Sequence, residues 1–123
     1  MSTLAVGTIK SVSSAPPVFQ NTSGTEKGQL AKVWVKFTTS SSATIDDSFN
    51  VSSVADRATG KYTVNFTNSM SNTNYAAVFG ANGNTAGYAG SETQNTGSID
   101  TYGSFGGSFN DMLFTNMAIF GDN

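Results

Sequence analysis

The chain contains no cysteine and no histidine. Without cysteine it has neither a disulfide framework nor a thiolate metal site, and its composition does not indicate a redox compartment. The absence of both residues also removes the commonest nucleophile and the commonest general acid or base. Catalysis by paired carboxylates is what remains, and the candidates are Glu26, Asp46, Asp47, Asp56, Glu92, Asp100 and Asp111.

The only adjacent acids are Asp46 and Asp47. Neighbouring side chains of a strand point to opposite faces, so these two carboxylates are poorly placed to act as a pair. They are suitable hard ligands for calcium, but the chain has no D-x-D-x-D-G spacing, and calcium binding by the loops is left open. We interpret the acids as solvated turn residues and predict no catalytic residue, no metal site, no cofactor and no enzymatic activity.

Charge is also scarce, because charged residues make up 11% of the chain and the net charge is −2. Nucleic-acid binding needs clustered Lys and Arg, so we predict no nucleic-acid partner. No apolar run is long enough to cross a bilayer, and the N-terminal stretch MSTLAVGTIKSVSS lacks a basic leader. We therefore expect a chain that starts near Met1, is made and folded in the cytosol, and does not insert into membranes.

The abundant Ser, Thr, Asn and Gly residues could indicate disorder, but 14 aromatic residues are spread through the chain. Disordered segments are usually poor in aromatic residues, so we expect a folded domain with polar loops. No window shows a helical period, whereas several stretches alternate polar and apolar residues. The sequence thus predicts an all-β chain: a single-domain antiparallel β-sandwich, jelly-roll-like, with little or no helix.

Residues 1–28 are predicted to form an extended N-terminal arm and loop, because they contain both prolines, Pro16 and Pro17, and the turn-rich stretch NTSGTEKG. Residues 29–123 are predicted to form the β-sandwich domain. The expected strands share β-branched and aromatic composition. They lie at about 29–37, 45–54 (one strand or two), 61–66, 75–80 and 112–120, the last as a central strand.

The turn ADRATG between FNVSSV and KYTVNF predicts a hairpin, and Asn82-Gly83 is a candidate type I′ turn. We expect short strands or loops over 82–96. The predicted core consists of apolar residues on the strands: Val33, Val35, Phe37, Val51, Tyr62, Val64, Phe66, Val78, Phe79, Leu113 and Ile119.

The stretch KVWVKF, residues 32–37, contains the only tryptophan. In a strand, Val33, Val35 and Phe37 share one face, and Trp34 shares the other with the two lysines. The largest apolar side chain of the strand is therefore predicted on its charged face. A tryptophan there serves either a contact with another chain, a second core or a platform that stacks on sugar.

Five stretches follow one another in a recognisable order: PVFQNTSGTEKGQLAKVWVKF, SFNVSSVADRATGKYTVNF, SMSNTN, YAAVFG and AIFGD. In this order they resemble a β-rich domain of tailed bacteriophages, especially marine and cyanobacterial phages. That domain forms the carboxyl-terminal segments of tail-fibre proteins and occurs in small structural proteins. The resemblance spans about 15–121 and is weakest between 82 and 108, where receptor-facing loops would vary.

The resemblance implies a non-enzymatic virion protein, assembled in the host cytoplasm and displayed on the particle surface. Its function would be that of a tail-fibre-type adhesin, or of its small companion, acting by multivalent attachment. The implied partners are copies of itself, with a trimer favoured, other tail or capsid proteins, and a host cell-surface glycan or protein. The alternatives are a capsid decoration (cement) protein that braces capsomers and a free carbohydrate-binding module.

Such domains form oligomers, and tryptophan is a preferred residue at interface cores. We therefore predict that Trp34, with Lys32 and Lys36 beside it, lies at a subunit or partner contact. The loops between 82 and 108 are predicted to contact the receptor or partner through Tyr88, Tyr102 and Phe105.

Overall fold

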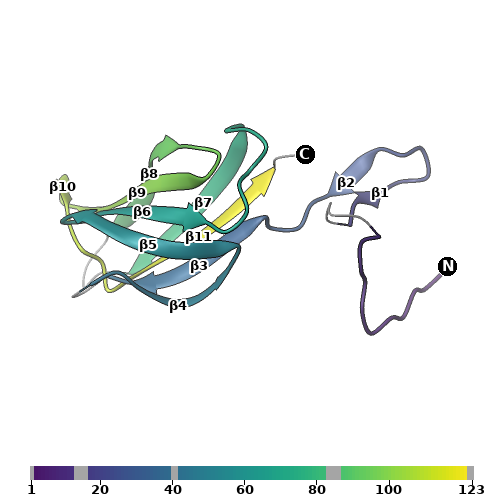
Figure 1. The fold of residues 1–123 in the computed structure, drawn as a ribbon, viewed down its shortest axis with the longest axis horizontal. Coiled ribbons are helices and arrows are strands. Elements are labelled where there is room, and N and C mark those ends of the chain that lie inside the picture. Colours follow the sequence, from purple (N-terminus) through teal and green to yellow (C-terminus); the bar gives the residue numbers. More distant parts are fainter. Residues whose placement is uncertain (1, 13–16, 40–41, 83–86, 122–123) are drawn as a thin grey trace. The chain divides into compact units, whose positions relative to one another are not determined.

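The computed structural model describes residues 2–12, 17–39, 42–82 and 87–121. Within these residues the chain contains eleven β-strands and no helix, and every strand pairing is antiparallel (Figure 1). The predicted all-β antiparallel fold is confirmed. No helix of the described residues is long and apolar enough to cross a membrane.

Residues 1–30 form a compact unit of their own, whose end lies close to the predicted boundary at residue 28. The predicted loop contains a short hairpin of β1 (Phe19–Gln20) and β2 (Glu26–Gly28). Asn21 holds the turn, since its Oδ1 accepts hydrogen bonds from the backbone N–H groups of Ser23 and Thr25. The large apolar side chains of this unit are exposed: Leu4, Val6, Ile9, Val12, Val18, Phe19 and Leu30.

Residues 31–123 form the second unit, which contains two sheets. The first sheet has the order β4 (Thr44–Phe49), β3 (Val33–Thr38), β11 (Phe114–Gly121) and β7 (Tyr75–Asn82). The strand predicted at 112–120 is central, as expected, because β11 pairs with both β3 and β7.

The second sheet is built around β9 (Ser98–Phe105). One side of β9 pairs with β6 (Lys61–Phe66), which pairs in turn with β5 (Val51–Ala58). The strand β9 also pairs with β8 (Tyr88–Gln94) and with the short β10 (Ser108–Phe109). The hairpin predicted between FNVSSV and KYTVNF is confirmed as β5–β6.

The prediction of loops over residues 82–108 is wrong, because most of this segment belongs to β8 and β9, although the short strands allowed for 82–96 are present as β8. Contact of this segment with a receptor stays a prediction. The side chains of Ile99 and Thr101 are fully buried. The Gly, Ala, Glu and Asp residues of β8 and β9 concealed these strands, since such residues are depleted in strands. The candidate turn at Asn82-Gly83 extends outside the described residues.

The two sheets pack face to face around one hydrophobic core. Phe37 of β3 meets Tyr62 of β6 edge to face at 5.5 Å between ring centroids, and Phe66 meets Tyr75 in the same way at 6.4 Å. Seven predicted core residues are buried: Val33, Val35, Phe37, Tyr62, Val64, Phe66 and Ile119. Val51 and Phe79 are partly buried against this core. The predicted β-sandwich is therefore present, while the jelly-roll connectivity stays a prediction.

The core prediction is wrong for Val78 and Leu113, which are exposed. Val78 alternates with the inward-facing Ala77 and Phe79, so its place on β7 directs it outward. Leu113 precedes β11 and does not share its alternation. The prediction also omitted five buried residues: Met70, Tyr75, Ile99, Met112 and Met117.

Candidate interaction surface

The outward face of the sheet β4–β3–β11–β7 carries a row of apolar side chains. The strand register places Phe49 of β4 opposite Trp34 of β3, Trp34 opposite Ala118 of β11, and Ala118 opposite Val78 of β7. Because these four residues occupy one cross-strand row, their side chains are neighbours on the same face.

A second row adds Phe120 of β11 opposite Ala76 of β7. We call the two rows the apolar face: Trp34, Phe49, Ala76, Val78, Ala118 and Phe120. Its large side chains remain accessible, with exposed fractions of 37% for Trp34, 54% for Phe49, 56% for Val78 and 37% for Phe120. Large contiguous apolar patches on soluble proteins mark interaction sites more often than single exposed residues do.

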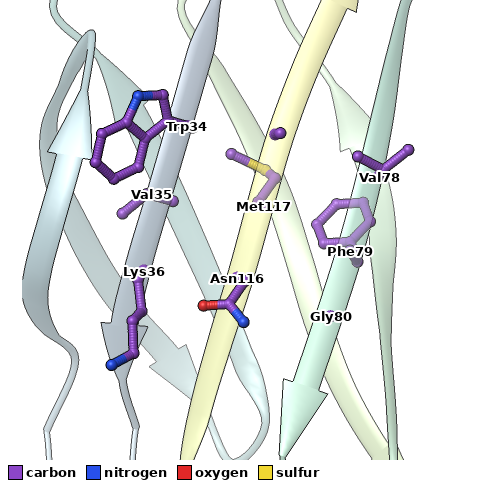
Figure 2. Close-up of a pocket in the computed structure, with 9 residues that line it drawn as sticks. Trp34, Val35, Lys36, Val78, Phe79, Gly80, Asn116 and Met117 are labelled. Carbon is purple, nitrogen blue, oxygen red and sulfur yellow. The ribbon is translucent and has the colours of Figure 1, made fainter. Parts of the chain in front are cut away.

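A groove of about 410 Å³ runs across this face between Trp34 and Val78 (Figure 2). Its central residues are small or polar: Ala118 and Asn116 on β11, and Gly80 on β7. A Cβ atom at Gly80 would lie 3.7 Å from Nδ2 of Asn116, an ordinary van der Waals separation. The groove is therefore open because the side chains between its walls are short.

Charged side chains form one margin of the apolar face. Nζ of Lys36 lies 3.4 Å from Oδ2 of Asp46 and 5.2 Å from the centroid of the Phe114 ring. The hydroxyl of Thr38 donates to the same Asp46 carboxylate at 3.2 Å. These contacts border one side of the apolar row with polar groups, as in the rim of many interfaces.

The alternation predicted for KVWVKF is confirmed. Val33, Val35 and Phe37 are buried in the core, whereas Trp34 and Lys36 are exposed on the opposite face. Lys32 precedes β3, and its backbone N–H donates to the carbonyl of Ile119 at 2.8 Å. The predicted contact role of Trp34 and the two lysines stays a prediction.

Sequence reasoning missed the other five members of the apolar face: Phe49, Ala76, Val78, Ala118 and Phe120. The outward direction of Val78 follows from its place between Ala77 and Phe79, which pack on the core, and Phe120 follows the buried Ile119. Their convergence could not be predicted, since it depends on β11 being inserted between β3 and β7. Strands distant in the sequence supply the four side chains of one row.

The residues predicted to contact a receptor lie on strands. Tyr88 is on β8 and Tyr102 on β9, and their rings meet edge to face at 6.3 Å between centroids. Phe105 is exposed at the end of β9. The structure therefore brings Tyr88 and Tyr102 together on the second sheet, away from the apolar face of the first.

The interpretation of the acids as turn residues is wrong for all but Asp111, because the other six candidates lie on strands, and several of the acids have structural contacts. Oδ1 of Asp111 accepts hydrogen bonds from the backbone N–H of Gly60 at 2.7 Å and from the hydroxyl of Tyr62 at 2.5 Å. Burial, followed by the hydrogen bond to Asp111, raises the pKa of the Tyr62 hydroxyl well above its usual value. Hydrogen bonds from Lys61 and then Arg57 lower the pKa of Glu92.

Within the described ranges, no group of three or more acidic residues is placed to hold a metal ion. The feature of the first sheet that most directly suggests a function is therefore the apolar face with its groove. Comparisons with protein-family models, with curated proteins and with solved structures find no match to this chain.

Proposed function

We propose that this chain is a non-enzymatic structural protein of a tailed-bacteriophage particle, displayed on the particle surface, whose copies associate through the apolar face. The observation that carries the association is the exposed row of Phe49, Trp34, Ala118 and Val78. The ordered resemblance of W-V-x-F, SFNVSSV and YTVNF to phage tail proteins supports the place on a virion.

Burial of these side chains supplies the driving force. Removing apolar surface from water stabilises an association by about 25 cal/mol per Å², before the costs of association are subtracted. Trp34 has the largest side chain of the row and lies between Phe49 and Ala118 in its register. Tryptophan residues surrounded by smaller contacts are frequent hot spots of binding energy.

The area of the apolar face limits how strongly two copies can bind through a single contact. Four strands spaced about 4.8 Å apart, each about seven residues long, cover a sheet roughly 19 Å by 23 Å. This projected area, roughly 440 Å², is smaller than the area of about 800 Å² per partner in a typical stable interface. A single contact of this size is modest, so durable attachment would come from several copies acting together, as in a tail-fibre-type adhesin or its small companion.

The association is tested by placing a charge on the apolar face. Val78→Asp should shift the protein toward monomer in sedimentation equilibrium, because pairing the face would then bury an unpaired carboxylate. The loss should be at least about tenfold in the association constant. At concentrations where the original protein is monomeric, the thermal unfolding of the variant should change little, since Val78 is exposed in the single chain.

Leu113→Asp is the matched control, because Leu113 is also exposed but lies outside the apolar face. This variant should associate like the original protein. Equal association of all three proteins would exclude the apolar face as the contact. Sedimentation also gives the number of copies, which tests the predicted trimer.

A capsid decoration protein is a second candidate, because the exposed apolar side chains of residues 1–30 offer another surface for a larger partner. Electron microscopy of intact particles separates the two candidates. Density for this chain at the tail supports the adhesin or its companion, and density on the capsid shell supports decoration.

A further inference from the structure

We propose that the outward face of the second sheet binds a neutral glycan built of hexopyranose units. The site is an aromatic–ionic patch, whose aromatic part is Tyr88, Tyr102 and Phe109 and whose ionic part is Arg57, Lys61, Glu92 and Asp100. This inference rests on the proposed attachment role and gives the chemical class of the receptor. It uses the opposite side of the sandwich from the apolar face.

Tyr102 is the centre of the aromatic part. Its ring meets Tyr88 at 6.3 Å and Phe109 at 5.8 Å between centroids, both edge to face. Tyr88 and Phe109 are exposed, while Tyr102 between them is half-buried. The three rings therefore form an edge-to-face chain whose two end rings are exposed to solvent.

The strand register explains why these rings meet. Tyr88 of β8 and Phe109 of β10 both lie opposite Ser104, on either side of β9. Tyr102 is two residues earlier on β9 and therefore points to the same side as Ser104. Gly106 and Gly107, both with positive φ, form the turn that returns β10 beside β9.

A glycine also fixes the position of the Tyr102 ring. Gly90 lies opposite Tyr102 on β8, and a Cβ atom built there would be 2.8 Å from the Tyr102 hydroxyl oxygen. A larger residue would therefore displace the ring. The absence of a side chain at Gly90 lets Tyr102 lie across β8.

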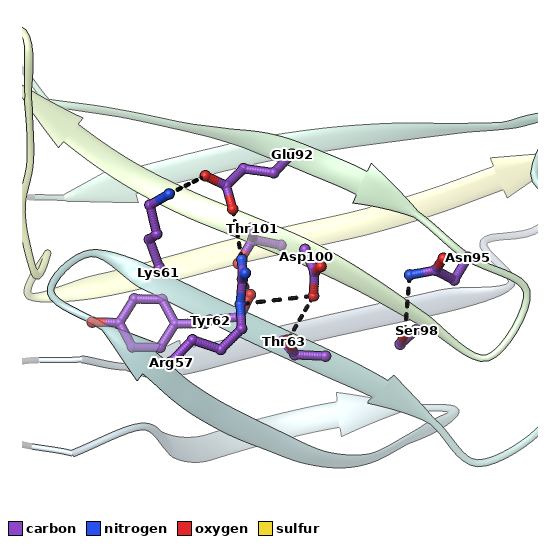
Figure 3. Close-up of polar contacts among 9 residues, drawn as sticks. All are labelled: Arg57, Lys61, Tyr62, Thr63, Glu92, Asn95, Ser98, Asp100 and Thr101. Atoms are coloured by element: carbon purple, nitrogen blue, oxygen red, sulfur yellow. Dashed lines mark hydrogen bonds and ion pairs between the residues drawn. The ribbon is translucent and has the colours of Figure 1, made fainter.

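The ionic part is a set of hydrogen-bonded charged side chains on β5, β6, β8 and β9 (Figure 3). Glu92 accepts hydrogen bonds from Nζ of Lys61 at 2.5 Å and from Arg57 at 2.7 Å. Nε of Arg57 lies 3.8 Å from Asp100, which also accepts a hydrogen bond from the Thr63 hydroxyl at 2.6 Å.

Lys61 joins the ionic and aromatic parts. Its Nζ lies 4.1 Å from the centroid of the Phe109 ring while it contacts Glu92. Charged groups thus stand directly beside exposed ring surface, on strands whose backbone is fixed by the sheet. This arrangement holds both kinds of group in place before a ligand arrives, which lowers the cost of binding.

A hexopyranose presents the two chemical features that the patch matches. Its C–H groups form an apolar face that packs on aromatic rings, and its hydroxyl groups both donate and accept hydrogen bonds. A carboxylate has about four acceptor positions, so Glu92 and Asp100 retain acceptor capacity after their present contacts. Lys61 and Arg57 supply donors.

The charge of the patch distinguishes this ligand from others. Two cations and two anions cancel, which disfavours a polyanion such as nucleic acid or a sulfated glycan. The cores of protein interfaces are depleted of Lys, Glu and Asp, whereas this patch contains all three beside its rings. A neutral ligand with many hydroxyl groups fits both observations.

Binding of the full chain to a printed array of neutral, anionic and sulfated oligosaccharides tests the proposal. We expect binding to neutral hexopyranose oligosaccharides and at least a tenfold loss of affinity in Tyr102→Ala. Gly90→Ala should also weaken binding, because it displaces the ring without removing it. Binding only to sulfated or other anionic oligosaccharides, or no loss in Tyr102→Ala, would overturn the proposal.

The matched control is Val78→Asp on the apolar face, assayed at equal concentration of chains in solution so that surface avidity does not contribute. It should keep the affinity for a neutral oligosaccharide while its self-association falls. The experiment therefore measures loss of glycan binding and loss of self-association separately. If no neutral oligosaccharide binds any better to the original chain than to Tyr102→Ala, the patch is not a glycan site.

Discussion

Asn50 is the residue at which the chain passes from one sheet to the other. It stands between β4 and β5 and is the only non-glycine residue with a positive φ, 58°, in the described part of the chain. Asparagine tolerates this left-handed conformation better than most residues. Its side chain accepts a hydrogen bond from the backbone of Asn68 and donates to the carbonyls of Lys32 and Asn68.

Replacing Asn50 should therefore destabilise the fold by two mechanisms. Asn50→Ala loses the side-chain hydrogen bonds, at about 1 kcal/mol each, and adds backbone strain of about 1–2 kcal/mol. Asn50→Gly loses the same hydrogen bonds without the strain, so it should be less destabilising by roughly 1 kcal/mol. Urea unfolding of both variants measures the difference, and a glycine variant less stable than the alanine variant would refute this role.

The individual strands could largely be predicted from the sequence, because alternation in VWVKF and KYTVNF reports local geometry. The corner at Asn50 could not, since the composition of residues 45–54 fits one strand or two and does not indicate that a single residue changes sheets there. The residue composition of β8 and β9 does not indicate that these segments are two paired strands. β9 pairs with β6, which is distant in the sequence and leaves no local signal, and β8 is held in the sheet by its pairing with β9.

The candidate functional residues, like the strands, could be predicted from the sequence only in part. Trp34 could be identified because its outward direction follows from the alternation of a single strand. The aromatic–ionic patch could not, because Lys61, Glu92 and Phe109 come from three strands that meet only in the folded sheet. The alternation of residues along one strand predicts the face to which each side chain points. Which side chains on different strands become neighbours depends on the order of the strands in the sheet.

The contacts of Glu92 with β5 and β6 predict a pH dependence at the level of the second sheet. Its pKa is lower in the folded chain than the ordinary value of 4.5, so the ionised carboxylate stabilises the fold above that value. This stabilisation is lost as the pH falls through the folded pKa. We expect Glu92→Gln to melt at a lower temperature than the original protein at pH 7, with a smaller difference near pH 3.

The difference at pH 7 should be small, because the contacts are accessible to solvent, and 1 M NaCl should reduce it further. Thermal melts at the two pH values and two salt concentrations provide the measurement. A difference that grows on acidification would contradict the assigned ion pairs.

At the scale of the whole molecule, the sandwich offers two outward faces with different chemistry. The first sheet presents the apolar face, and the second presents rings interspersed with paired charges. We propose that the first face joins copies and that the second contacts a receptor. Assembly through one face would leave the other free on every copy, which is the geometry that multivalent attachment requires.

Fluorescence of Trp34 is the most direct test of whether copies associate through the apolar face, because Trp34 is the only tryptophan and lies on this face. Emission of the unmodified protein is followed through a dilution series, alongside sedimentation at the same concentrations. We expect emission at shorter wavelength in the associated protein and a shift to longer wavelength as it dissociates, with the same midpoint by both methods. Emission that stays constant while the protein dissociates would contradict the placement of Trp34 in the contact, as would a chain that is monomeric throughout the series.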